Sequence, residues 1–156
     1  MPEKLLILGG TREAYELAEC LVDRYPPRQL TVISSLAGIT GNPKVPAGQV
    51  RIGGFADTYD EGAKSGQNSI LGLRKYLLQE KITFLVNATH PYATRISENA
   101  LAVATELGLP YLRLTRPAWL KHTGDQWIEV PDLAAAAEYL KSESIDTNSR
   151  MSKQIV

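Results

Sequence analysis

The segment from Thr89 to Arg95, THPYATR, holds the side chains best suited to chemistry in this sequence. An imidazole such as that of His90 can donate, accept or transfer a proton near neutral pH. Pro91 lacks a backbone N–H and restricts the turn, so this segment is expected to hold a defined conformation. We expect His90 to contact a ligand and treat it as a candidate proton donor. Thr89, Tyr92 and Arg95 are candidate polar contacts. The alternatives are that His90 bonds only to backbone and that Arg95 is a solvated helix residue.

A second candidate is the turn Gly9-Gly10-Thr11, which leads from the apolar run KLLILGG into a helical pattern. Glycines allow a tight turn and close approach of a ligand, and the free N–H groups at a helix N-terminus suit a phosphate. The turn is not a GxGxxG motif, and Glu13 could compete with an anion there. Nucleotide binding and a merely structural turn both stay open.

The next expected strand ends in Ser34-Ser35-Leu36-Ala37-Gly38, without an acidic residue. NAD-specific folds place an acid at this point to hold the ribose 2′-hydroxyl. Its absence favours NADP, whose 2′-phosphate would not be repelled. Contacts are expected from hydroxyl groups, from Gly38 and from a nearby cation, with these candidates: Arg12, Lys44 and Arg51. The alternative is a serine-rich structural turn.

Strand and helix patterns alternate along the chain and position these segments. Strands are expected at 4–10, 29–35, 50–55, 82–88, 110–117 and 126–130. Apolar residues at helical spacing follow most of them, around 14–21, 70–77, 96–107 and 131–143. Gly108 is expected near the C-cap of the third of these helices, and Pro131 and Asp132 in the first turn of the last. Residues 57–69 are polar, contain two glycines and lack periodicity, so they are expected to form an exposed loop, with Asn68 or Ser69 capping the helix that follows. The pattern predicts an α/β fold, a Rossmann-like, doubly wound parallel sheet with helices on both faces.

Length and composition restrict the class of protein. The 156 residues suit one domain and have a formal net charge of zero, which gives no reason to expect nucleic-acid binding. The apolar runs are too short for a membrane span, no signal peptide is apparent, and a cytoplasmic location is expected. Cys20 is interpreted as a structural thiol and His122 as a surface residue. No metal-ligand cluster and no Ser-His-Asp pattern is apparent, so no metal is expected.

The end of the chain, residues 142–156, lacks periodicity. We expect a domain over residues 1–141 that binds NADP, followed by a disordered or atypical tail.

Taken together, six segments resemble the precorrin-6A reductases and the related cobalt-precorrin-6A reductases of cobalamin biosynthesis. They occur in the family's order: ILGGTREA, SLAG, VRIGGF, NATHPYATRISENA, YLRLTRPAW and GDQWIEV. The resemblance covers roughly Lys4 to Leu140. It implies an oxidoreductase that transfers hydride from NADPH to a double bond of a corrin-ring precursor, precorrin-6A or its cobalt form.

The resemblance also implies roles for individual residues. Those facing the cofactor phosphates would be Gly9, Gly10 and Thr11. Those near the adenosine ribose would be Ser34 and Ser35. Those beside the nicotinamide or the macrocycle would be Thr89, His90, Pro91 and Tyr92. Those meeting substrate carboxylates or rings would be Arg113, Arg116 and Trp119.

Two departures from the family pattern affect these expectations. The polar loop over 57–69 is longer than usual, and the second Rossmann-like half of the family is missing after Leu140. The alternative function is therefore a truncated, catalytically inactive nucleotide-binding fragment. Self-association through the face left by the missing half is also expected. A third interpretation, a short-chain-type or nucleotide-sugar oxidoreductase, is disfavoured in its short-chain form by the lack of a Tyr-x-x-x-Lys pair.

Overall fold

A computed structural model describes residues 2–38, 45–55, 65–116, 120–142 and 154–155. The chain divides into two compact units, Met1–Arg116 and Pro117–Val156. This division lies upstream of the boundary between residues 141 and 142 expected from the sequence, which stays a prediction. Lys44, Trp119 and most of the expected tail lie outside the described residues.

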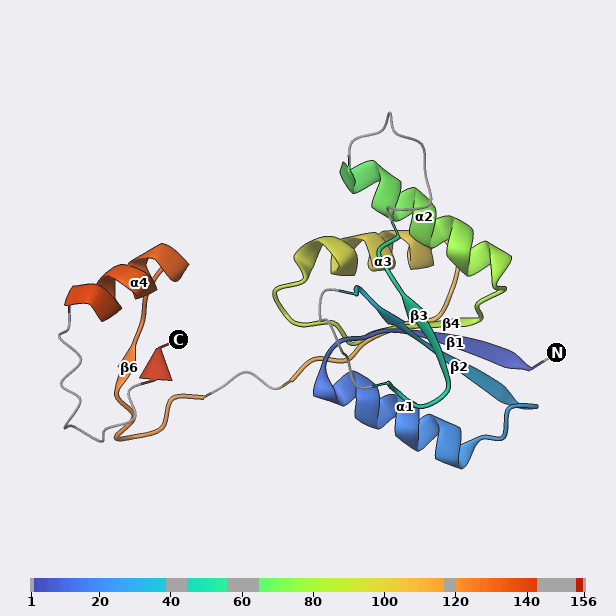
Figure 1. Ribbon diagram of the computed structural model, residues 1–156, viewed down its shortest axis with the longest axis horizontal. Helices are drawn as coiled ribbons and strands as arrows, with labels where there is room; N and C mark the ends of the chain where they lie inside the picture. Colours follow the sequence, from blue (N-terminus) through green and yellow to red (C-terminus); the bar gives the residue numbers. More distant parts are fainter. Residues whose placement is uncertain (1, 39–44, 56–64, 117–119, 143–153, 156) are drawn as a thin grey trace. The chain divides into compact units, whose positions relative to one another are not determined.

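The first unit is built on a parallel sheet of five strands, ordered β3-β2-β1-β4-β5 (Figure 1). The strands are β1 (Glu3–Leu8), β2 (Leu30–Leu36), β3 (Gln49–Ile52), β4 (Phe84–Asn87) and β5 (Tyr111–Arg113). This is the strand order of doubly wound, dinucleotide-binding folds. The predicted α/β class and parallel sheet are confirmed.

Helices cover both faces of this sheet, which explains the continuous apolar run of β1. Leu5 and Ile7 pack on the face that holds α1 (Arg12–Arg24), together with Ala14 and Ala18 of that helix. Leu6 and Leu8 pack on the other face, under α2 (Ser65–Gln79) and α3 (Thr94–Leu107). Figure 1 shows the same arrangement of helices. Because side chains alternate along a strand, a strand buried on both faces needs apolar residues throughout.

The helix ends agree with the sequence in some places and differ in others. Gly108 closes α3 in the left-handed conformation, at φ 63°, as predicted. By contrast, α2 begins at Ser65, so the expected loop is too long and the expected caps, Asn68 and Ser69, lie inside the helix. Gly66 suggested a break, but a glycine in a helix costs only about 1 kcal/mol relative to alanine.

The second unit contains β6 (Trp127–Ile128), α4 (Leu133–Ser142) and β7 (Gln154–Ile155). β6 and β7 pair in parallel, so they bracket α4 in the chain order of a strand–helix–strand unit. The carboxylate of Asp132 accepts a hydrogen bond from Ala135 N–H at 2.8 Å, which makes it the cap of α4 rather than a member of its first turn. β7 lies within the segment expected to be a tail, and its two described residues are too few to show any periodicity.

Candidate functional site

The carboxyl ends of the parallel strands bring the predicted segments to one edge of the sheet. β1 pairs with β2 on one side and with β4 on the other, so Leu8 lies between Ser35 and Asn87. The chain connections diverge on either side of β1, and ligands of doubly wound folds bind at such a point. The turn after β1 is therefore the centre of the candidate site.

The turn after β1 contains two glycines with different roles. A Cβ on Gly9 would lie 3.4 Å from the Cβ of Ala14 and 3.5 Å from Leu36 Cδ2, so Gly9 lies in ordinary contact with α1 and β2. Gly10 has φ +113°, a conformation that other residues rarely adopt. No described atom lies within 4 Å of the place a Cβ would take on Gly10. The backbone there is open to a ligand.

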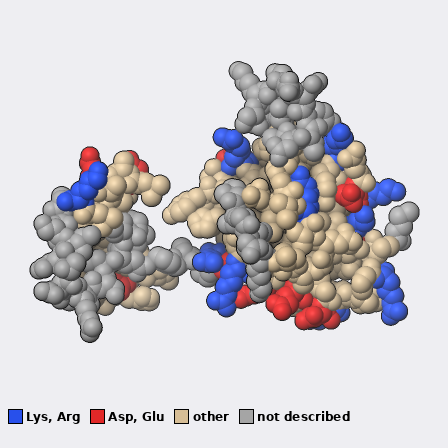
Figure 2. Space-filling view, in the orientation of Figure 1, with Lys and Arg blue, Asp and Glu red and all other residues tan. Residues whose placement is uncertain are grey.

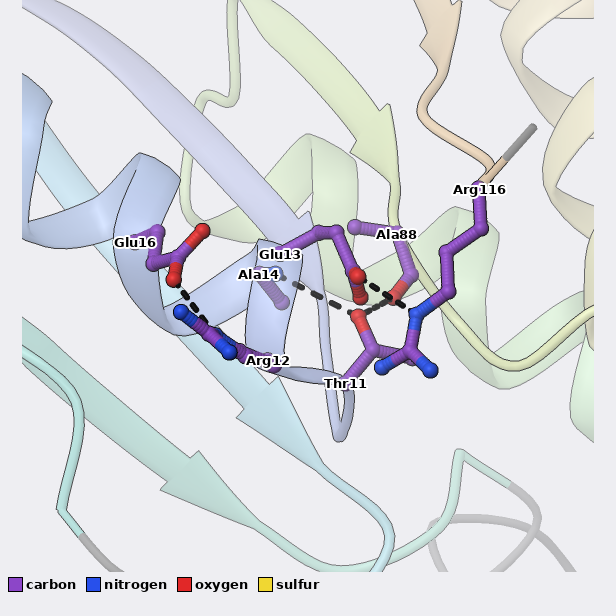
Figure 3. A network of polar contacts seen from close by, with 7 residues as sticks. All are labelled: Thr11, Arg12, Glu13, Ala14, Glu16, Ala88 and Arg116. Atoms are coloured by element: carbon purple, nitrogen blue, oxygen red, sulfur yellow. Dashed lines mark hydrogen bonds and ion pairs between the residues drawn. The ribbon is translucent and has the colours of Figure 1, made fainter.

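Thr11 starts α1 and ties it to β4. Its hydroxyl accepts a hydrogen bond from Ala14 N–H at 3.3 Å and donates one to the carbonyl of Ala88 at 2.7 Å (Figure 3). The hydroxyl proton is thus already used. Any contact of Thr11 with a phosphate falls to the N–H groups at the start of α1.

Ser34 lies beside this turn with an unsatisfied hydroxyl. Its side chain is buried, with 2% exposed, and its Oγ has no hydrogen-bond partner among the described residues. It lines a shallow hollow together with both glycines of the turn, Tyr15 and Leu36. A buried hydroxyl without a partner is unfavourable, so a polar group that reached Ser34 would remove this penalty.

Ser35 and Arg51 belong to the ends of β2 and β3. Arg51 Nη1 donates to Ser35 Oγ at 3.2 Å and to the carbonyl of Gly53, and Nη2 donates to the carbonyl of Gly54 at 2.7 Å. The guanidinium also lies 4.1 Å from the centre of the Phe55 ring. A positive charge is therefore held at the place where the sequence lacks an acid.

Arg12 and Gly38, the other two residues expected near the ribose, differ in their surroundings. Arg12 is exposed and bonds to Glu16 at 2.6 Å, and this hydrogen bond raises the pKa of its guanidinium above the ordinary value. The pair points along α1 and away from Arg116 (Figure 3). Gly38 has φ +79°, and a Cβ there would lie 3.2 Å from Ile52 Cγ2. Gly38 thus follows β2 in a conformation that suits glycine.

Asn87, a residue that the sequence analysis did not single out, organises the end of β4. It is buried, with 1% exposed; its Nδ2 donates to the hydroxyl of Tyr111 at 3.1 Å. Its Oδ1 accepts from Thr89 N–H at 3.2 Å and from Thr89 Oγ at 2.8 Å. The available signal was an amide within the apolar run TFLVNA, where a buried polar side chain needs partners.

His90 and Tyr92 lie on the exposed turn that follows. Tyr92 N–H donates to His90 Nδ1 at 3.4 Å, and the two rings lie 5.1 Å apart. With Nδ1 as acceptor, a neutral imidazole carries its proton on Nε2. Tyr92 is 88% exposed, and Arg95 is an exposed residue at the start of α3.

Arg116 follows β5, at the edge of the sheet, and pairs with a residue at the start of α1. Its Nε lies 2.5 Å from Oε1 of Glu13, in the first turn of α1 (Figure 3). This hydrogen bond is the main reason that the pKa of Glu13 is held below its ordinary value of 4.5. Arg113 ends β5 as an exposed residue. The segment after β5 thus meets the predicted cofactor turn.

The described helices include none that is long and apolar enough to cross a membrane. Within the same residues, no group of three or more His, Cys, Asp or Glu side chains could hold a metal ion.

Comparison with known proteins gives a consistent result. The family model described as "Precorrin-6x reductase CbiJ/CobK" matches residues 4–153. The precorrin-6A reductase of Mycobacterium tuberculosis is 43% identical over 133 residues, which are 85% of this chain and 47% of that protein. That of Rhodobacter capsulatus is 37% identical over 137 residues, which are 88% of this chain and 48% of that protein.

Solved structures agree with this relationship. A structure titled CobK precorrin-6A reductase superposes with a TM-score of 0.72 and 38% identity, covering 87% of this chain and 48% of the other. An L-threonine dehydrogenase from Clostridium difficile gives a TM-score of 0.50 at 16% identity, covering 72% and 36%. The second likeness concerns the fold alone.

Proposed function

Because this chain belongs to the precorrin-6x reductase CbiJ/CobK family, we propose that it forms the NADPH-binding half of an oxidoreductase that reduces a C=C bond of precorrin-6A, or of its cobalt form, in cobalamin biosynthesis. The chain spans about half the length of the curated relatives it matches, at 47% and 48%. The substrate is then a corrinoid that carries many carboxylates.

The single observation that carries the proposal is the turn after β1. Gly10 leaves its backbone open, the N–H groups at the start of α1 lie beside it, and Ser34 has a buried, unpartnered hydroxyl next to the same turn. These features fit the pyrophosphate and adenosine part of a dinucleotide. When bound, NADPH would supply the hydride, and the protein would orient it.

The end of β2 supports NADPH over NADH. No carboxylate follows β2 where NAD-specific folds use one, and Arg51 holds a guanidinium against Ser35. A 2′-phosphate carries about two negative charges and meets a cation there rather than an acid.

The turn after β4 supports a role in handling substrate. In its imidazolium form, His90 could deliver from Nε2 the proton that must follow hydride addition, and it would be left as the neutral imidazole. Tyr92 and Arg95 are exposed on the same segment and could contact the macrocycle or its carboxylates. The hydroxyl of Thr89 donates its proton to Asn87 Oδ1. Its oxygen could therefore only accept a hydrogen bond from the cofactor.

A second candidate follows from the length of the chain. With about half of its relatives' length present, the chain could bind nucleotide without catalysing reduction. This catalytically inactive fragment predicts the same cofactor affinity and no turnover.

The test is calorimetric titration of the purified chain with NADPH and NADH, followed by a turnover assay with precorrin-6A. Tighter binding of NADPH together with turnover supports the reductase. NADPH binding without turnover supports the inactive fragment. If neither nucleotide binds, the proposed cofactor site is wrong.

A further inference from the structure

We propose that Arg116 acts on the cofactor side of the site: it neutralises Glu13 and donates hydrogen bonds to the pyrophosphate at the start of α1. This inference rests on the proposed NADPH-binding function and deepens it. The family resemblance pointed instead to a contact between Arg116 and the substrate.

The geometry places the guanidinium beside the first turn of α1, where a pyrophosphate would bind. Arg116 bonds to Glu13 through Nε, and its two Nη groups have no partner among the described residues. Figure 3 shows the guanidinium next to Thr11, at the first turn of α1. A phosphate held by the N–H groups of that turn comes within reach of the Nη groups, and a guanidinium can bond a carboxylate and a phosphate together.

The charges around α1 explain why such a cation is needed. The helix carries four acidic residues, Glu13, Glu16, Glu19 and Asp23, and acidic side chains gather along it in Figure 2. Glu13 stands in the first turn, where its carboxylate occupies the favourable end of the helix dipole and repels an incoming anion. Arg116 cancels that charge at a distance of 2.5 Å.

A second feature independently points to a ligand at this place. The hydroxyl of Ser34 is buried and has no partner in the described part of the chain, and Ser34 lies beside Gly9 and Gly10. A buried hydroxyl without a partner calls for a group that the protein alone does not supply. The orphaned hydroxyl and the ion pair of Arg116 with Glu13 both lie next to the turn that starts α1.

The test measures NADPH affinity for three variants: R116Q, E13Q and the double variant. We expect R116Q to weaken binding about tenfold or more, since it removes charge-assisted hydrogen bonds and leaves a bare carboxylate. E13Q should tighten binding severalfold. The double variant should bind better than R116Q, because the repelling carboxylate is gone.

The matched control is R74Q, which breaks the exposed pair between Arg74 and Glu106 (2.7 Å) on the opposite face of the sheet. It should bind NADPH like the unaltered chain. Adenosine 2′-monophosphate, which lacks the pyrophosphate, supplies a second readout. Its affinity should not change in R116Q, whereas a general structural defect would lower it.

Two results would overturn the inference. If the unaltered chain binds NADPH and R116Q binds it equally well, Arg116 does not act on the cofactor and the proposed function survives. If the unaltered chain binds no NADPH, the inference falls together with the proposed function.

Discussion

Three hydroxyl groups surround the turn after β1, and they differ in the hydrogen bonds that they still have to offer. Thr11 has used its proton on Ala88, and Ser35 accepts from Arg51, whereas Ser34 has no described partner. Residue type alone could not separate Ser34 from Ser35, because the distinction depends on where Arg51 is held.

Ser34→Ala should raise the free energy of unfolding of the free chain and lower its affinity for NADPH. Removing an orphaned buried hydroxyl relieves a penalty of about 1 kcal/mol. Urea unfolding measures the first effect and calorimetry with NADPH the second. The matched control is Ser35→Ala, which loses a bonded hydroxyl and should lower the free energy of unfolding instead. Equal changes in both variants would contradict this interpretation of Ser34.

His90→Gln should reduce turnover by about 100-fold while NADPH affinity stays unchanged, because an amide cannot transfer the proton. Stopped-flow absorbance of NADPH oxidation with precorrin-6A measures the rate. Near-normal turnover in His90→Gln would exclude His90 as the proton donor and favour an ordered water.

The Glu13 carboxyl group should titrate below its ordinary pKa of 4.5, and R116Q should raise that pKa. A carboxyl whose pKa is depressed on folding stabilises the protein above its unfolded pKa, and this contribution is lost as the pH falls through the folded value. NMR titration of the Glu13 side chain gives both pKa values. No change in R116Q would mean that the pair does not form in solution.

At the scale of the elements, Thr11 provides the side-chain cap at the start of α1. Thr11→Val keeps the shape of the side chain but loses the cap and the bond to Ala88. We expect a loss of about 1–2 kcal/mol in the free energy of unfolding. Urea denaturation measures it, and Thr11→Ser, which retains both hydrogen bonds, is the control. Equal stability of the two variants would contradict the role of the cap.

Several elements could be predicted from local patterns, and the exceptions have physical reasons. The continuous apolar run of β1 predicted burial on both faces, and Gly108 predicted the end of α3. The start of α2 was missed because Gly66 resembled a break. The ion pair of Glu13 with Arg116 joins residues 103 positions apart, and no local pattern encodes such a contact.

At the scale of the whole molecule, the sheet of the first unit ends in an edge strand with exposed apolar surface. Leu112 of β5 is 56% exposed, and among the described strands β5 pairs with β4 alone. Edge strands of this kind favour association between chains. The expected self-association through such a surface stays a prediction of the sequence analysis.

Leu112→Lys should reduce that self-association, since a charge on an edge strand opposes pairing with another chain. Sedimentation velocity over a range of concentrations measures the association of both proteins. Leu101→Lys, an exposed residue of α3 that is 53% exposed, is the control. A chain that is monomeric at all concentrations before substitution would contradict the prediction.

The position of β1 in the sheet also bears on how the chain is made by the ribosome. β2 is synthesised soon after β1 and can pair with it early. The other edge of β1 pairs with residues 84–87, so Leu5 has no partner there until Phe84 has been synthesised. Until that stretch has emerged from the ribosome, the nascent chain presents one side of the apolar strand β1 without a partner. Synthesis that pauses before β4 therefore leaves a surface that chaperones and proteases recognise.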